Sequence, residues 1–199
     1  MKQDLINASN ELLKKQREED VWKDKPFESF NYLNADYSGK AGEIALFNFL
    51  KRTKENGLHN WSIIYKGDCN SNESDGTYDM GIIIETKKNR SGIKTARIGK
   101  QKSFQHDHLH DEQCDCEILL DITPSCAYLT VINFKNYSLK NTHPIFGLTP
   151  HLRKNTSNNY KLDLRENHLE KGVKGGITIK LDETVSEEEI ISFLKVFLD

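Results

Sequence analysis

Residues 74–88 read SDGTYDMGIIIETKK, so that three isoleucines lie between two groups of charged residues. The run Ile82–Ile84 is β-branched, which is typical of a strand buried in a sheet. Turn-forming residues precede it, from Gly67 to Asn72 and again at Gly76. The pattern predicts a buried strand that carries charge where it ends, at Glu85-Thr86-Lys87.

Glu85 and Lys87 are two positions apart, and alternate residues of a strand point to the same face. A carboxylate and an ammonium are therefore expected side by side. Hydrolysis of a phosphodiester uses both groups, because carboxylates hold a divalent cation and a positive charge stabilises the transition state or activates water. An ordinary surface ion pair is the alternative, since Glu-x-Lys occurs often by chance.

A second carboxylate is needed on the same cation, and the turn before the strand offers Asp75 and Asp79. Asp79 lies six residues before Glu85, which leaves room for a tight turn at Met80-Gly81. Asp75 lies ten residues before Glu85 and allows a short hairpin. Both assignments stay open on spacing alone.

This stretch resembles the PD-(D/E)xK nucleases, in which an acid on one strand of a hairpin is followed by acid-x-Lys on the next. The resemblance covers about residues 40–132, roughly half of the chain. The proline that often precedes the first acid is absent, and Ser74 or Tyr78 stands in its place. The string that begins at Tyr78 reads like the family's acid leaving a strand, which favours Asp79 over Asp75.

The resemblance implies magnesium-dependent cleavage of double-stranded DNA, with Glu85 and Asp79 or Asp75 as metal ligands. Lys87 would orient or help to deprotonate the attacking water. Many family members carry a glutamate on the first core helix that contacts the metal, and Glu43 is the matching residue. The alternative for Glu43 is an acid in a first helical turn that interacts with the helix dipole.

Positive charge is concentrated after the predicted active-site strand. Residues 86–106 contain seven Lys or Arg and no Asp or Glu, although the whole chain has a net charge of −2. Such a block is an electrostatic footprint for a polyanion, and a solvated basic loop is the alternative. A loop over residues 151–161 is rich in side chains that can read bases. The predicted DNA-binding residues are Lys88, Arg90, Lys94, Arg97, Lys100, Lys102, His106, His108, Arg153, Asn158 and Asn159.

The four cysteines are too few and too irregularly spaced for a disulfide framework. Since no secretory signal is seen, reduced thiols and a cytoplasmic location are expected. Alternating histidines at positions 106, 108 and 110 precede Cys114 and Cys116, but structural zinc sites use wider spacings. No apolar run approaches the roughly 18 residues of a membrane span.

The order of elements predicts an α/β fold with a mixed central β-sheet flanked by helices, a restriction-endonuclease-like core with extra terminal helices. Helices are predicted within residues 1–25 and at 40–55 and 96–110. A last helix is predicted after a capping box at Ser186 and Glu189, with its apolar positions from Ile190 to Leu198. Strands are predicted at residues 61–66, 82–84, 117–122, 127–134 and 176–181, and a loop at 136–159.

The length of 199 residues favours a single nuclease domain. Its parts would be an N-terminal helical extension for dimerisation at 1–36, a catalytic core at 38–134, and the recognition loop with a C-terminal strand and helix at 136–199.

The predicted function is that of a magnesium-dependent type II restriction endonuclease that cuts a short specific site in double-stranded DNA. A homodimer is expected, because it presents one active site to each strand of a palindrome. The alternatives are a phage or DNA-repair nuclease of the same fold and a catalytically inactive nucleic-acid-binding module.

Overall fold

The computed structural model describes residues 6, 7, 10, 14, 20–66, 81–99, 102–109, 114–133, 151–154, 160–166, 169, 177–181 and 184–199. Its helices are α2 (Glu28–Tyr32), α3 (Ala35–Glu55) and α5 (Glu187–Leu198). Its strands are β1 (Ser62–Lys66), β2 (Gly81–Glu85), β3 (Arg90–Arg97), β4 (Ser103–Leu109), β5 (Cys116–Ile122), β6 (Ala127–Asn133), β7 (His151–Lys154), β8 (Tyr160–Arg165) and β9 (Ile177–Leu181).

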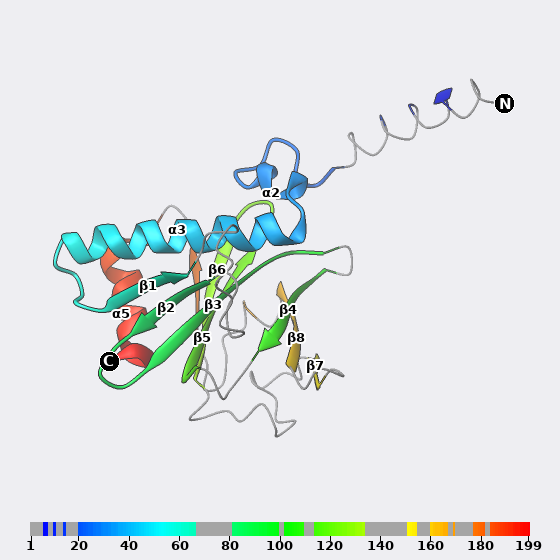
Figure 1. The fold of residues 1–199 in the computed structure, drawn as a ribbon. Helices are drawn as coiled ribbons and strands as arrows, with labels where there is room; N and C mark the ends of the chain where they lie inside the picture. Colours follow the sequence, from blue (N-terminus) through cyan, green and yellow to red (C-terminus); the bar gives the residue numbers. More distant parts are fainter. Residues whose placement is uncertain are drawn as a thin grey trace.

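A six-stranded mixed sheet with the order β1-β2-β3-β5-β6-β9 forms the middle of the molecule (Figure 1). Neighbouring strands are antiparallel except β3 and β5, which run parallel from Ser91↔Cys116 to Arg97↔Ile122. A parallel pair needs a crossover connection. Between these two strands the chain contributes β4 to a second, three-stranded sheet with the order β4-β8-β7.

Helices α3 and α5 cover one face of the six-stranded sheet, and the three-stranded sheet lies against the other face (Figure 1). Leu50 of α3 and Leu194 of α5 share a core cluster with Ile118 of β5. The next residue of β5, Leu119, packs in a different cluster with Phe104 of β4. Strand β5 is therefore buried on both faces, which explains its nearly continuous apolar sequence.

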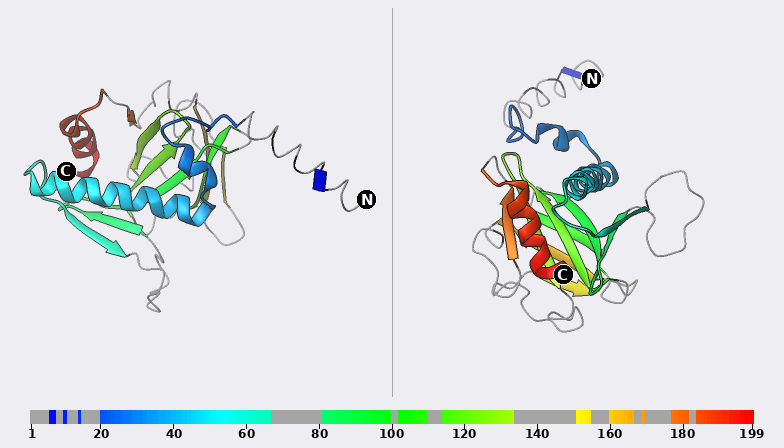
Figure 2. Two further views of the ribbon diagram at one scale, coloured as in Figure 1. Left: turned by 90° about the horizontal axis from the view of Figure 1, so that it is seen from above. Right: turned by 90° about the vertical axis from the view of Figure 1, so that its left-hand side faces the viewer.

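Strands β2 and β3 pair only beside the turn that joins them. Their register contains Ile84↔Ser91 and Glu85↔Arg90, whereas β1 pairs with all five residues of β2. The first three residues of β2, Gly81–Ile83, have no partner in β3 within the described ranges. The sheet divides here, with β1 and β2 leaving the plane of the other strands (Figure 2). We call the separation of β2 from the part of β3 beyond Ser91 the fork.

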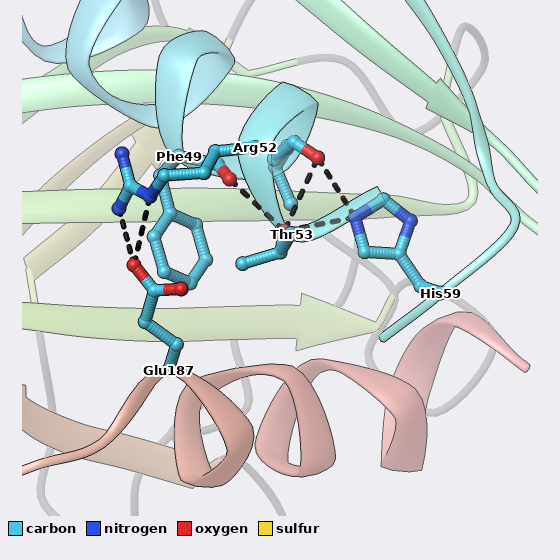
Figure 3. A network of polar contacts seen from close by, with 6 residues as sticks. Phe49, Arg52, Thr53, His59 and Glu187 are labelled. Carbon is cyan, nitrogen blue, oxygen red and sulfur yellow. Dashed lines mark hydrogen bonds and ion pairs between the residues drawn. The ribbon is translucent and has the colours of Figure 1, made fainter. Parts of the chain in front are cut away.

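A polar network ties the C-terminal half of α3 to α5 and to the chain that enters β1 (Figure 3). Arg52 donates to the Glu187 carboxylate at the start of α5, from Nε at 2.9 Å and also from Nη2. The Thr53 hydroxyl donates to the Phe49 carbonyl at 2.9 Å and lies 3.1 Å from Nε2 of His59. These contacts link α3 to α5 and to the chain before β1.

Several predicted elements are confirmed. The strands at β1, β2, β5, β6 and β9 agree with the predictions to within a few residues. The capping box at Ser186 and Glu189 is present at the start of α5. Helix α3 begins earlier than predicted, at Ala35, because the Asn34 side chain accepts a hydrogen bond from the Tyr37 amide and caps it. None of the described helices is long and apolar enough to span a membrane.

The predicted helix at residues 96–110 is wrong. Its first residues belong to β3, and residues 103–109 form β4, which pairs antiparallel with β8. A turn separates the two strands, with Lys102 in the left-handed region at φ 54°. The predicted loop at residues 136–159 is wrong in part, since β7 lies within it. Strand β4 pairs with β8, which is distant in sequence, so local sequence patterns do not reveal it. Strand β7 pairs with β8, the next strand along the chain.

The described part of the N-terminal region consists of helical positions at 6, 7, 10 and 14 and of turns from residue 21 to residue 27. Trp22 is buried against Ile122 and Ala127 at the β5–β6 end of the sheet. The Phe27 amide donates to the Pro124 carbonyl at 3.3 Å. The turns at residues 22–27 are therefore attached to the core, whereas positions 6, 7, 10 and 14 are exposed.

Candidate active site

The predicted Glu85-Thr86-Lys87 motif lies at a turn. Glu85 is the last residue of β2, Lys87 follows in the turn to β3, and both side chains are exposed. The Thr86 amide donates to the Asn89 carbonyl at 2.9 Å, and the Asn89 side chain donates to the Leu198 carbonyl at 3.2 Å. The turn is thus attached to the end of α5. Glu85 and Lys87 do not share a strand face, contrary to the prediction, because the strand ends at Glu85.

Asp75 and Asp79, the candidates for the first metal ligand, lie outside the described residues. Their role stays a prediction. By its place in the sequence, Asp79 precedes the first residue of β2, Gly81, by two positions.

Glu43 lies on α3 and is buried, with 7% of its surface exposed. Among the described residues its Oε2 has no hydrogen-bond partner. Burial raises the pKa of this carboxyl, while Lys40 and Lys94 lower it. Because α3 begins at Ala35, Glu43 lies beyond the first turn. An interaction with the helix dipole, which falls off within that turn, does not explain its position.

Helix α3 packs tightly against β3 at Gly42. A Cβ atom on Gly42 would lie 2.2 Å from Oγ1 and 2.8 Å from Cβ of Thr95. Only glycine allows the helix to pass at this distance. The contact brings Glu43, the next residue of α3, close to Lys94, the residue before Thr95. This explains the electrostatic effect of Lys94 on Glu43.

Lys94 lies at the edge of the fork and is partly exposed. Its ammonium lowers the pKa of two buried carboxyls, that of Glu43 and that of Glu117 on β5. Glu117 is only 1% exposed, and burial raises its pKa to about 7, against the lowering effects of Lys94 and His106. Among the described residues neither Glu117 oxygen has a hydrogen-bond partner. The Lys94 ammonium therefore lies within electrostatic range of the Glu43 and Glu117 carboxyls, which have oxygens without hydrogen-bond partners among the described residues.

The Glu117 carboxylate occupies the space next to Gly92, its register partner on β3. A Cβ atom on Gly92 would lie 2.8 Å from Oε2 and 3.1 Å from Cδ of Glu117. The Sγ atom of Cys114 is also 3.1 Å from this point. A side chain at position 92 is therefore excluded while Glu117 keeps its position.

His106 and Asp121 form a second polar pair in the interior, between the two sheets. Nε2 of His106 on β4 lies 2.7 Å from Oδ1 of Asp121 on β5, and both side chains are almost completely buried. The prediction that His106 contacts DNA is therefore wrong for this structure, because the side chain has no access to the surface. Its burial results from the pairing of β4 with β8, which faces it toward β5.

The other predicted DNA-binding residues are divided between the surface and contacts within the protein. Lys88, Arg90 and Lys102 are exposed, and Lys94 is partly exposed at the fork. Arg97 donates from Nη1 to the Phe30 and Asn31 carbonyls, at 2.7 Å each. Lys100, Asn158 and Asn159, and the side chains of His108 and Arg153, lie outside the described residues.

Glu117 and Asp121 were not among the site residues predicted from the sequence. Both interrupt the otherwise apolar strand β5, which reads CEILLDI. Charged residues are almost never fully buried unless they are paired, so two acids in such a strand were a usable signal. Lys94 was predicted to contact DNA but not to belong to an active site.

The described residues contain no group of three or more His, Cys, Asp or Glu side chains arranged to hold a metal ion. Glu43 and Glu117 supply two carboxylates near one cationic side chain. Hard divalent cations prefer such oxygen ligands and keep several water ligands of their own. None of Cys114, Cys116 and Cys126 forms a disulfide within the described part of the chain.

No family model matches the chain, and no curated protein has a significantly similar sequence. The chemistry of the fork therefore carries the functional interpretation.

Proposed function

We propose that this protein is a magnesium-dependent nuclease that cleaves DNA, and that its active site lies at the fork. The observation that carries the proposal is the position of Glu43. Its carboxylate is buried on α3, has an oxygen without a hydrogen-bond partner among the described residues, and lies within electrostatic range of Lys94. Burial of an unsatisfied carboxylate costs free energy, which indicates a role other than stability.

The residues at the fork fit the needs of phosphodiester hydrolysis. Glu43 would hold the cation through a carboxylate oxygen, and Asp79 is the sequence-predicted second ligand. Lys94 would orient the attacking water or stabilise the negative charge that develops on the phosphate. A bound magnesium ion supplies a Lewis acid and lowers the pKa of water.

The β2–β3 turn supports the same chemistry less well. Glu85 pairs with Arg90, which lies four residues before Lys94 on β3. At a rise of about 3.3 Å per residue, these levels of the strand are roughly 13 Å apart. Glu85 is exposed, while Glu43 lies at the level of Lys94 and Thr95. A single ion with ligands at about 2.1 Å would not be expected to bind Glu43 and Glu85 together.

The test compares two pairs of variants on supercoiled plasmid with magnesium. Glu43→Gln and Lys94→Met are expected to slow cleavage at least about 100-fold, because each removes a group from the reacting site. The matched pair at the turn, Glu85→Gln and Lys87→Met, should retain rates within a few-fold of the original protein. Circular dichroism checks that all four variants fold.

The opposite ranking would place the active site at the turn, as the sequence alone predicted. Absence of magnesium-dependent cleavage in the unmodified protein, on plasmids of varied sequence, would refute the nuclease proposal itself. A protein that binds DNA without cutting it would favour the nucleic-acid-binding module.

A further inference from the structure

We propose that Glu117 is a divalent-cation ligand, and that its carboxylate and Lys94 form an acid-x-Lys arrangement built from two neighbouring strands. The identity of the reaction rests on the proposed nuclease function. The cation site does not, because binding can be measured without cleavage.

The spacing on β3 points to position 92 as the place for the acid. Gly92 and Lys94 are two residues apart on one strand, so their Cα–Cβ directions share a face. An acid at 92 would complete an acid-x-Lys pattern, but glycine has no side chain. Glu117 is the residue that pairs with Gly92 in the parallel register of β3 and β5.

The carboxylate of Glu117 fills the space that a side chain at position 92 would enter. Its Oε2 lies 2.8 Å and its Cδ 3.1 Å from the site of a Cβ atom on Gly92. A real side chain there would collide with the carboxylate. The neighbouring strand therefore supplies a carboxylate where β3 itself lacks one, within electrostatic range of Lys94.

The surroundings of Glu117 indicate a ligand rather than a structural contact. The side chain is 1% exposed, and among the described residues neither oxygen accepts a hydrogen bond. A buried carboxylate that served only the fold would be hydrogen-bonded, because an unsatisfied buried polar group destabilises the protein. The nearby His106 does not fill this role through Nε2, which binds Asp121 at 2.7 Å.

The geometry allows the carboxylate to be moved from one strand to the other. In the double variant Gly92→Glu/Glu117→Gly, the glycine on β5 vacates the space and the glutamate on β3 fills it. The acid-x-Lys pattern then lies on a single strand. The single variant Gly92→Glu should be destabilised by the collision, and Glu117→Gly should lack the carboxylate.

The experiment measures Mn²⁺ binding to the full chain by isothermal titration calorimetry, with circular dichroism and thermal unfolding as checks of the fold. Glu117→Gln and Glu117→Gly are expected to lose at least about tenfold in affinity, since even supporting residues of metal sites contribute that much. The double variant should regain most of the loss. Asp121→Asn, which changes another buried acid on the same face of β5, is the matched control and should bind Mn²⁺ normally.

Normal Mn²⁺ affinity in Glu117→Gln would overturn the proposal, as would an equal loss in Asp121→Asn. A folded double variant that stays as weak as Glu117→Gly would also overturn it. If the double variant does not fold, the comparison of Glu117→Gln with Asp121→Asn decides.

Loss of Mn²⁺ binding in Glu117→Gln, in a protein that cleaves no DNA, would support the cation site and reject the nuclease proposal. Cleavage that requires Glu43 and Lys94 but not Glu117 would support the nuclease proposal and reject Glu117 as a cation ligand.

Discussion

Glu117 lies in the interior of the protein with a pKa raised to about 7 by burial, whereas its ordinary value is 4.5. Below pH 4.5 the folded and unfolded chains both hold the proton, and the residue has no net effect on the pH dependence. Between pH 4.5 and about 7 the unfolded chain loses the proton first, so the free energy of unfolding falls as the pH rises. Above about pH 7 the free energy of unfolding no longer falls on account of Glu117, because both states have lost the proton.

Replacing Glu117 with Gln should remove this loss, because an amide does not ionise. We expect the variant to be more stable than the original protein at pH 7.5, by as much as roughly 3 kcal/mol, and closer to it at pH 4.5. Urea unfolding with EDTA present measures the free energy of unfolding of the two proteins at each pH. Equal pH dependence in the two proteins, or a less stable variant at pH 7.5, would show that Glu117 is satisfied in the folded state.

A stabilising substitution that also removes Mn²⁺ binding would have a clear physical meaning. Residues kept at a cost to stability are expected where function requires them. The same reasoning applies to Glu43, whose pKa is also raised by burial, although Lys40 and Lys94 oppose the effect.

The contact of α3 with β3 positions the candidate site. Gly42→Ala would bring a methyl group to 2.2 Å from Oγ1 of Thr95, so helix and strand would have to separate. Overpacking of this kind typically destabilises by about 1–3 kcal/mol. We expect urea unfolding of Gly42→Ala to show this decrease in the free energy of unfolding. Cleavage should also be slower, since Glu43 moves with the helix.

Gly39 provides the matched control on the same helix. A Cβ atom at Gly39 meets no atom within 4 Å. Gly39→Ala should therefore stabilise α3 by up to about 1 kcal/mol through helix propensity and leave cleavage unchanged. If both alanine variants behave alike, the close approach of Gly42 to Thr95 does not position the site.

The elements that sequence analysis predicted are those with strong local signals. Strand β5 is a dense apolar run, and α5 begins with a capping box at Ser186 and Glu189. Strand β4 lacks such a signal, because the alternation of buried and exposed positions that its pairing with β8 produces is carried by polar residues such as Gln105 and His106. Its polar sequence is equally compatible with a helix until the partner strand is known.

The candidate site was predictable in part for the same reason. Glu43 was predicted from the resemblance to the PD-(D/E)xK nucleases, by its place on an expected helix. The two acids in β5 could have indicated Glu117 as a buried acid, but its relation to Lys94 depends on the pairing of Gly92 with Glu117, residues that are distant in sequence. Only the parallel register of β3 and β5 brings them together.

The acids near the fork come from both faces of the six-stranded sheet, one covered by helices and the other by the three-stranded sheet. Glu43 comes from the helical layer, and Glu117 lies on the face of β5 that turns toward the three-stranded sheet, as its neighbour His106 shows. Lys94 lowers the pKa of both carboxyls, although they come from opposite faces of the sheet. It lies on the part of β3 that does not pair with β2 within the described ranges.

A duplex has two strands of opposite direction, and each chain offers one candidate site at its fork. We therefore predict that double-strand cleavage needs a symmetric pair of chains, each cutting one strand. Mixing the original protein with Lys94→Met subunits tests this directly. Hybrid dimers would carry one competent fork, so supercoiled plasmid should accumulate as nicked circles, whereas the undiluted original protein should yield linear DNA.

The control is the original protein diluted with buffer to the same concentration of active chains. If the mixture and the buffer dilution give the same ratio of nicked to linear product, each chain acts alone, and the homodimer proposal fails while the site at the fork stands.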